Sequence, residues 1–237
     1  MNPKDPSLYP KVMSERKTLE LLLTGAYQGL ARYGDGDFAC LRGQMDRYQA
    51  PTPDLAYALA EGLRRPHPDV LNAIIAPPGH GTFVNQRWIC YFEANAGIIP
   101  MLDRDYEYGN ASLSRMDSCV QLHTEEWWLE VAKLWKDQEV TLIRGSERSL
   151  TAQMMLESPN SPESVTEVIS SVRNAWSHYD RILKETRDAG HQVVILCTGL
   201  VARPLVHALV AAGHSAFDVG HFGLWFKDEK PIEVPRP

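Results

Sequence analysis

The sequence predicts an α/β fold of the Rossmann-like kind, with a mainly parallel sheet and helices on both of its faces. Segments with strand character alternate with segments of helical periodicity, most clearly from residue 121 onward, and this alternation is typical of parallel sheets. The stretch "HQVVILCTG" (191–199) also carries a continuous apolar run, which indicates a strand buried on both faces. Such sheets bind ligands at the carboxyl ends of their strands.

Length and composition favour a single domain. The chain has 237 residues, of which 44% are hydrophobic and 23% are charged, and this is enough to build one sizeable core. We therefore predict one domain over 1–237, with an N-terminal extension at 1–13 and a loose tail at 228–237.

Charge and hydropathy exclude several classes of protein. The formal net charge of -6 argues against general affinity for a nucleic-acid backbone or an anionic membrane. The first residues lack the apolar core of a signal peptide, and no apolar run reaches the roughly 18 residues of a membrane span. The four cysteines show no CxxC spacing, as expected of reduced thiols. We expect a cytoplasmic protein without a membrane span, and leave homo-oligomerisation open.

The first half of the chain is predicted to hold three helices and two strands. The helices span 14–31, 53–65 and 85–102, and the strands span 38–41 and the stretch "VLNAIIAPP" (70–78). Ser14 is placed to cap the first helix, although Lys17 stands where a capping box has an acidic residue. Pro53 suits the first turn of the second helix.

The second half alternates more regularly between helices and strands. An amphipathic helix at 121–136 precedes the strand "EVTLIRG" (139–145), and "SPNSPES" (158–164) is predicted to be a loop. The remaining elements are a helix over 172–189, the strand at 191–199, a helix over 203–212 and a final strand at 215–222.

The stretch "GDGD" (34–37) places two carboxylates in a glycine-rich loop. Asp35 and Asp37 can converge on one hard cation, because Gly34 and Gly36 allow the backbone to fold tightly around it. A cation held in this way can bridge to a diphosphate. The alternative is a turn whose aspartates bond only their own backbone. An EF-hand is excluded, since no glutamate follows at the required distance.

Three further segments have residue types that suit a phosphate or a sugar. Thr198 and Gly199 end the strand at 191–199, and the start of the next helix, with Arg203, suits a phosphate. The alternative there is an ordinary turn. The segment "LIRGSERSL" (142–150) places Gly145 and Arg148 at the end of a strand, where they suit a phosphate. The alternative is that Arg148 only forms a surface ion pair. The segment "NASLSRMD" (110–117) concentrates hydrogen-bond donors on Asn110, Ser112, Ser114 and Arg115, which suits a sugar or a phosphate. The alternative for this segment is a solvated loop.

The segment "FDVGHFG" (217–223) ends the last predicted strand with Asp218 and His221. Histidine is the usual proton carrier near neutral pH, although a lone histidine is more often structural. The chain has no GxSxG, HExxH, Walker A or GxGxxG motif, so the better-known hydrolase and nucleotide-binding signatures are absent from it.

Taken in order, these segments resemble the bacterial GT-D type glycosyltransferases, a family long catalogued as a domain of unknown function. The order and spacing of the family's motifs agree over nearly the whole chain. The family's "RFGDGE" loop reads "RYGDGDF" (32–38) in this chain, and its "SR" segment reads "SLSRMD" (112–117). Its strand with glycine and arginine reads "LIRGSERS" (142–149), and its "NAF" helix start reads "RNAW" (173–176). Its "GPTA" loop reads "TGLVARP" (198–204), and its "DIGH" segment reads "DVGH" (218–221).

The resemblance implies a Rossmann-like enzyme of the GT-D type that uses a nucleotide sugar, typically a UDP-sugar, and a divalent metal, Mn²⁺ or Mg²⁺. It implies Asp35 and Asp37 as metal ligands, and Asp37, Asp218 and His221 as candidates for catalysis. The residues implied to bind the donor are Arg32, Gly34, Gly36, Asn110, Ser112, Ser114, Arg115, Gly145, Arg148, Asn174, Thr198, Gly199 and Arg203.

The chain departs from the family pattern at three points. The second acidic residue of the metal loop is Asp37 instead of glutamate, which shortens the side chain by one carbon. Arg203 and Pro204 vary the "GPTA"-like loop. The carboxylate that often follows "DIGH" is replaced by "FGLWF" (222–226), and the next acids are Asp228 and Glu229. The residue that would deprotonate the acceptor is therefore left open.

The leading hypothesis is a metal-dependent glycosyltransferase whose acceptor is a glycan, a glycosylated protein or a modified base in DNA. A DNA acceptor would require a basic groove, for which the candidates are Arg42, Arg47, Arg64 and Arg65. One alternative is a non-catalytic module that binds a nucleotide or sugar on the same fold. Another is a metal-dependent phosphohydrolase, which normally needs more histidine or aspartate ligands than the sequence offers.

Overall fold

A computed structural model of the chain describes residues 5–46, 48–76, 91–92, 94–114, 124–145, 149–220 and 222. These residues form a seven-stranded sheet in the order β3-β2-β1-β7-β6-β4-β5, and every pair of neighbouring strands is parallel. The predicted Rossmann-like fold class is thus confirmed. The strands are β1 (Gly29–Tyr33), β2 (Val70–Ile74), β3 (Gly109–Asn110), β4 (Glu139–Arg144), β5 (Ser164–Ile169), β6 (Val193–Cys197) and β7 (Ser215–Asp218).

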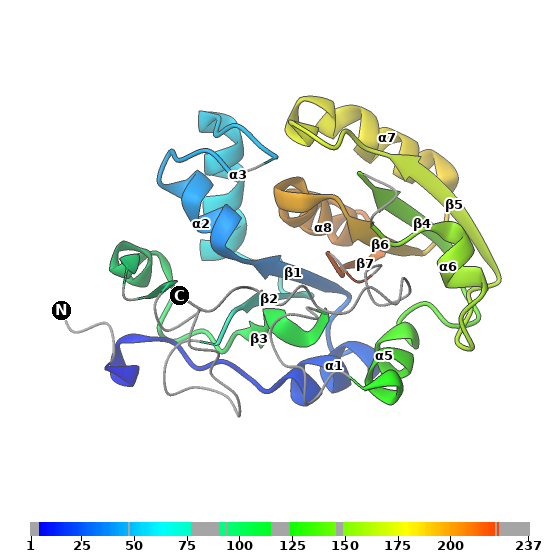
Figure 1. Cartoon of the computed structure of the whole chain (residues 1–237), viewed down its shortest axis with the longest axis horizontal. Helices are drawn as coiled ribbons and strands as arrows, with labels where there is room; N and C mark the ends of the chain where they lie inside the picture. The colour runs from blue at the N-terminus through cyan, green and yellow to red at the C-terminus, as the bar shows by residue number, and fades with distance from the viewer. Residues whose placement is uncertain are drawn as a thin grey trace, which may run out of the picture.

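Helices cover both faces of the sheet, as Figure 1 shows. One face carries α2 (Asp35–Leu41), α3 (Pro53–Arg64), α7 (Tyr179–Ala189) and α8 (Ala202–Ala211). On the other face lie α1 (Glu15–Leu23) and α5 (Glu125–Ala132), and α6 (Ala152–Leu156) follows β4. The short 3-10 helices are η1 (Pro6–Leu8), η2 (Ala96–Met101), η3 (Ala111–Ser114), η4 (Ala175–His178) and η5 (Gly199–Val201).

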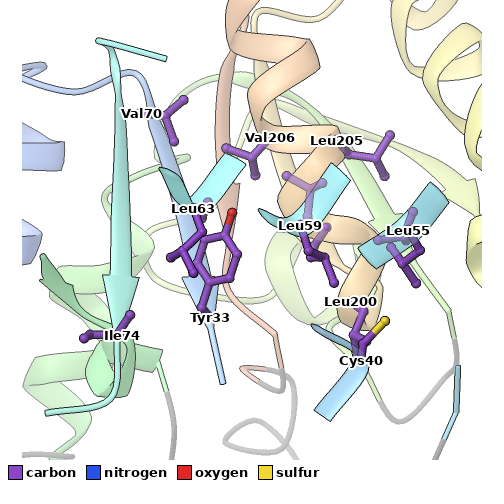
Figure 2. Close-up of a cluster of buried hydrophobic side chains, with 14 of the residues drawn as sticks. Tyr33, Cys40, Leu55, Leu59, Leu63, Val70, Ile74, Leu200, Leu205 and Val206 are labelled. Atoms are coloured by element: carbon purple, nitrogen blue, oxygen red, sulfur yellow. The ribbon is translucent and has the colours of Figure 1, made fainter. Parts of the chain in front are cut away.

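Alternating side chains of the strands feed two apolar clusters, one on each face. In β6, Val194 and Leu196 join the cluster under α3 and α8, whereas Ile195 and Cys197 join the cluster on the face of α1 and α5. This alternation is the period of two that a strand imposes. Figure 2 shows part of the first cluster, including the α3, α8 and β1 side chains labelled Leu59, Leu63, Leu205, Val206 and Tyr33.

The predicted strand at 38–41 is wrong, because these residues belong to the helix α2. The strand instead precedes the aspartate loop, as β1. Gly34 caps α2, and Asp37 accepts a hydrogen bond from the Gly34 amide at 2.8 Å. A short apolar run such as "FACL" fits a buried strand and a buried helical turn equally well, and the capping carboxylate decides between them here.

The predicted helix over 14–31 is also too long. The helix α1 ends at Leu23, and the chain turns through Gly25 before Leu30 enters β1. The expected cap at Ser14 is confirmed, since its hydroxyl accepts from the Lys17 amide at 3.1 Å. The predicted helix over 53–65 agrees with α3 to within one residue.

The remaining expectations are confirmed in part. The strands β2, β4, β6 and β7 and the helix α8 lie where the sequence predicts them. The predicted helix over 172–189 begins only at Tyr179, and α6 and β5 were not predicted. Of the predicted helix over 85–102, residues 91–92 and 94–102 lie within the described residues. Residues 91, 92 and 94 are helical, and η2 follows them. Among the described helices, none has both the length and the apolar character needed to cross a membrane.

Candidate active site

The chain changes direction across the sheet between β1 and β7, which are hydrogen-bonded neighbours. From β1 the sheet extends through β2 to β3 on one side, and from β7 it extends through β6 and β4 to β5 on the other. Open parallel sheets bind ligands outside the carboxyl ends of their strands at such a switch point. The aspartate loop follows β1 directly, so the sequence and the topology indicate the same place.

Four buried charged side chains meet at this point. The Arg203 guanidinium lies 2.8 Å from Asp37 Oδ2 and 3.5 Å from Asp218 Oδ2. The Arg32 Nη2 atom lies 3.2 Å from Asp218 Oδ1, and Arg32 also donates to the backbone carbonyls of Asp218 and Ala111. Each of the four side chains is at most 10% exposed. Two cations therefore balance two anions inside the protein, as buried charges require.

Gly220 leaves the space that the Arg32 guanidinium occupies. A Cβ atom at this position would lie 1.9 Å from Arg32 Nη2, and the backbone φ of +53° is one that other residues rarely adopt. The Gly220 amide also donates to Asp218 Oδ1 at 3.0 Å. The glycine of "DVGH" is thus needed for the charge cluster.

The Asp37 carboxyl group is the most strongly perturbed acid of the site. Burial raises its pKa to about 6, although the neighbouring Arg203 cation and the Gly34 amide act in the opposite direction. Its Oδ2 atom contacts both of these groups, whereas its Oδ1 atom is buried and has no hydrogen-bond partner among the described residues. A buried carboxylate oxygen without a partner is costly, and in an active site it points to a ligand that the protein alone does not supply.

Asp35 and Gly36 lie beside this acid on the first turn of α2. Asp35 is half-buried, and its backbone carbonyl accepts from the Tyr91 hydroxyl at 3.4 Å. Gly36 lies against Asp46, because a Cβ at this glycine would be 3.0 Å from Asp46 Oδ1. The sequence did not predict that Asp46 lies next to the aspartate loop, because Asp46 comes from the connection between α2 and α3.

The strands on the other side of the switch point present neutral hydroxyl groups. The Ser170 and Thr198 hydroxyls lie 2.6 Å apart and are buried. The backbone of Gly145 approaches the same serine, and the Gly199 carbonyl, at a positive φ of 65°, accepts from Arg203. The predicted residues Gly145, Thr198 and Gly199 are therefore brought together. Ser170 lies beside them, and no sequence motif around Ser170 predicted this position.

The predicted donors at 110–114 lie at the carboxyl end of β3 and in η3. Asn110 Oδ1 accepts from the Ser112 amide at 2.9 Å, and the Ala111 carbonyl accepts from Arg32. The Ser114 hydroxyl is fully buried, and no residue in the described ranges forms a hydrogen bond with it. This edge of the sheet is thus joined to the charge cluster through Arg32.

Asn174 lies in the connection between β5 and α7, and its predicted donor-binding role stays a prediction. It adopts a left-handed conformation with φ 51°, and its side-chain oxygen accepts from the Ala50 amide at 2.9 Å. It therefore joins the connection before α7 to the connection before α3. Of the remaining predicted site residues, Arg115, Arg148 and His221 lie outside the described part of the chain.

The match to a family model decides the family. The model of the glycosyltransferase GT-D fold matches residues 30–232, which is most of the chain. The chain belongs to this family. The matched region includes β1, the aspartate loop and the end of β7, so the charge cluster lies within the part that the family shares.

Relatives and solved structures agree with this assignment. The chain is 24% identical over 229 residues to the "Probable glycosyl transferase Gly" of Streptococcus gordonii, covering 91% of this chain but only 33% of that protein. It thus spans about a third of the length of this curated relative. The structure described as "The highly conserved domain of unknown function 1792 has a distinct glycosyltransferase fold" superposes with a TM-score of 0.81 at 21% identity, covering 94% of this chain and 82% of that one.

A second solved structure, "A New Glycosyltransferase (DUF1792) from Streptococcus sanguinis", gives a TM-score of 0.78 at 22% identity. It covers 92% of this chain and 85% of the other. At this level of identity, the likeness to both structures establishes the fold and leaves donor and acceptor to be argued from the residues themselves.

Proposed function

We propose that this protein transfers a sugar from a nucleotide sugar, of which a UDP-sugar is the first candidate, with the help of a divalent cation such as Mn²⁺ or Mg²⁺. The observation that carries the proposal is the buried Oδ1 atom of Asp37, which lacks a hydrogen-bond partner in the described part of the chain and lies beside the half-buried Asp35. Carboxylate oxygens are the ligands that these hard cations prefer. The two aspartates fit such an ion as a partial ligand set.

The rest of the ligand set would come from the substrate and from water. Among the described residues, no group of three or more His, Cys, Asp or Glu side chains is arranged to hold a metal ion. Mg²⁺ in particular is commonly bound by one or two carboxylates together with substrate phosphates. A bound cation would supply positive charge to the diphosphate that leaves during transfer.

Arg203 and Arg32 hold the carboxylates of the site in place. Arg203 contacts both Asp37 and Asp218, and Arg32 joins Asp218 to the Ala111 carbonyl of η3. Because both arginines are buried with their anions, their main task is to orient the site. The Asp37 Oδ1 atom, to which no described residue bonds, remains for the cation. The catalytic role predicted for Asp218 stays a prediction, and its 1% exposure keeps it from direct contact with bulk water.

The products of the reaction test the proposal. The protein would be incubated with UDP-sugars and GDP-sugars in the presence of Mn²⁺, and the released nucleoside diphosphate and inorganic phosphate would be measured separately. We expect slow release of the nucleoside diphosphate alone, reduced by about a hundredfold or more in Asp35→Asn. Release of inorganic phosphate would favour the phosphohydrolase. No release with any donor, despite tight nucleotide binding, would favour the non-catalytic module.

A further inference from the structure

The two edges of the sheet differ in length and in cover. The edge strand β3 has two residues, and beside it the Tyr108 amide donates to the Lys11 carbonyl while the Met13 amide donates to the Tyr108 carbonyl, both at 2.9 Å. The other edge strand, β5, has six residues, and β4 is the only strand of the described residues that pairs with it. Figure 1 shows β5 along the outer edge of the sheet. A long open edge of this kind is a template for pairing with a further strand.

The backbone of β5 turns alternate residues toward β4. Each of its six residues is in register with one residue of β4, so the strand has no bulge. The Ser170 amide, directly after the strand, donates to the Arg144 carbonyl at 2.9 Å, and this sets the alternation. The Ile169 carbonyl accepts instead from Arg181 of α7 at 3.0 Å, as the same alternation requires. The backbone groups that face away from β4 are therefore those of Val165, Glu167 and Ile169.

The strand β5 lacks the residues that natural edge strands use against pairing. Its sequence, "SVTEVI" (164–169), has no lysine, proline or glycine. Its one charged residue, Glu167, is engaged within the chain, because its carboxylate lies 2.7 Å from Arg144 Nη2 and accepts from the Ala152 amide at 2.8 Å. The open edge thus presents backbone groups without an uncompensated charge between them.

Exposed apolar side chains accompany this edge. Ile169 is 48% exposed, and so is Leu156 at the end of α6. Glu167 bonds the start of α6, and Ile169 follows two residues later in the strand, so α6 and Ile169 lie on the same face of β5. The helix α6 begins beside Glu167, and the chain after it returns to the start of β5 at Ser164. Leu156 therefore lies toward the start of the edge, whereas Ile169 lies at its end.

We infer that β5 is the interface for a second copy of this chain, which pairs with it in the antiparallel direction about a two-fold axis. The outward backbone groups of each β5 bond those of the other, and the two sheets become continuous. The two-fold axis brings Leu156 of each copy toward Ile169 of the other, because these residues lie toward opposite ends of the edge. The inference goes beyond the proposed reaction and does not depend on it.

The charges at the two ends of the edge fit an antiparallel partner. At the start, Glu163 precedes β5 and Glu139 lies beside its first residue in β4, and both are exposed. Exposed Arg173 follows the end of the strand. An antiparallel copy brings the acidic start of each strand toward the arginine of the other, whereas a parallel copy would bring like charges together. Three further ion pairs near these ends are neutralised within the chain: Lys136 with Asp137, Arg181 with Glu185 and Arg144 with Glu167.

Sedimentation velocity at increasing protein concentration, combined with backbone amide exchange followed by NMR, tests the inference. We expect the native protein to form dimers in which the Val165 and Glu167 amides exchange more slowly than in the monomer. Ile169→Lys places a charge on the edge and should weaken association by at least about tenfold. The matched control is Leu23→Lys, which changes an exposed apolar residue of α1 and should associate like the native protein. Thermal unfolding checks that both variants fold.

Three results would overturn the inference. One is a native protein that stays monomeric at every concentration. Another is a dimer that is as stable in Ile169→Lys as in Leu23→Lys. The third is that the Val165 and Glu167 amides exchange at the same rate in monomer and dimer, because β5 would then be no part of the interface. None of these measurements depends on whether the proposed reaction is correct.

Discussion

The two sides of the candidate active site neutralise their polar groups in different ways. At the ends of β1 and β7, Asp37 and Asp218 are buried together with the cations Arg32 and Arg203. At the ends of β5 and β6, the neutral hydroxyls of Ser170 and Thr198 bond each other. The first side depends on complete charge pairing and is sensitive to the loss of any member. The second side holds no charge at this pair of hydroxyls, so losing one of them leaves only a neutral group without its partner.

The largest effect is expected from breaking the charge cluster. Arg203→Met leaves two buried carboxylates without this cation, and we expect the free energy of unfolding to fall by about 3–5 kcal/mol. Urea denaturation followed by circular dichroism measures this value. The matched control is Arg181→Met, which removes an exposed ion pair with Glu185 and should cost less than about 1 kcal/mol. Equal losses in the two variants would contradict the dependence of the first side on complete pairing of its buried charges.

The pH dependence of stability should separate the two sides next. Burial raises the pKa of Asp37 to about 6, so the folded protein retains this proton between about pH 4 and pH 6, where the unfolded chain has lost it. The resulting stabilisation is present below pH 4 and is lost as the pH rises through 6. We expect the stability of the native protein relative to Asp37→Asn to fall by about 2–3 kcal/mol over this range.

This comparison would be made by urea denaturation at several pH values in the presence of a chelator. The control is Thr198→Val on the neutral side, because its difference from the native protein should not change with pH. A stability difference for Asp37→Asn that stays constant from pH 4 to pH 7 would mean that the Asp37 carboxyl group is not held as described.

The smallest effect is expected in the hydroxyl pair. Removing one partner leaves a buried hydroxyl unbonded, so Ser170→Ala and Thr198→Val should each lower the free energy of unfolding by about 1 kcal/mol. The double variant should lose less than the sum of the two, because no unbonded hydroxyl remains. A double-mutant cycle measures this coupling. Additive losses would show that the two hydroxyls act independently.

The sequence predicted the order of most elements and the position of the aspartate loop, because both depend on local patterns. The apolar run before Thr198 and the two glycines around Asp35 are visible without a structure. The assignment of "FACL" to a strand failed, because a four-residue apolar run does not distinguish a strand from a buried helical turn. The strand β5 was missed, because it lies at the edge of the sheet with few buried residues.

The contacts that define the site were harder to predict for another reason. The pairing of Asp37 with Arg203 joins residues that only the return of the chain to the centre of the sheet brings together. From the sequence alone, the position of Arg203 is compatible with binding a phosphate and equally compatible with pairing with a carboxylate. Asp46 and Ser170 carry no motif, and their places next to Gly36 and Thr198 follow from the packing of connections that have no regular periodicity.

Calorimetric titration with UDP, in the presence and absence of Mn²⁺, tests the central claim most directly. The native protein should bind UDP only when Mn²⁺ is present, and Asp35→Asn should weaken this binding by about tenfold or more. The matched control is Asp54→Asn, since Asp54 occupies the first turn of α3 as Asp35 occupies that of α2, and it should bind UDP normally. Equal binding of UDP in a chelator, or equal loss in both variants, would contradict the account.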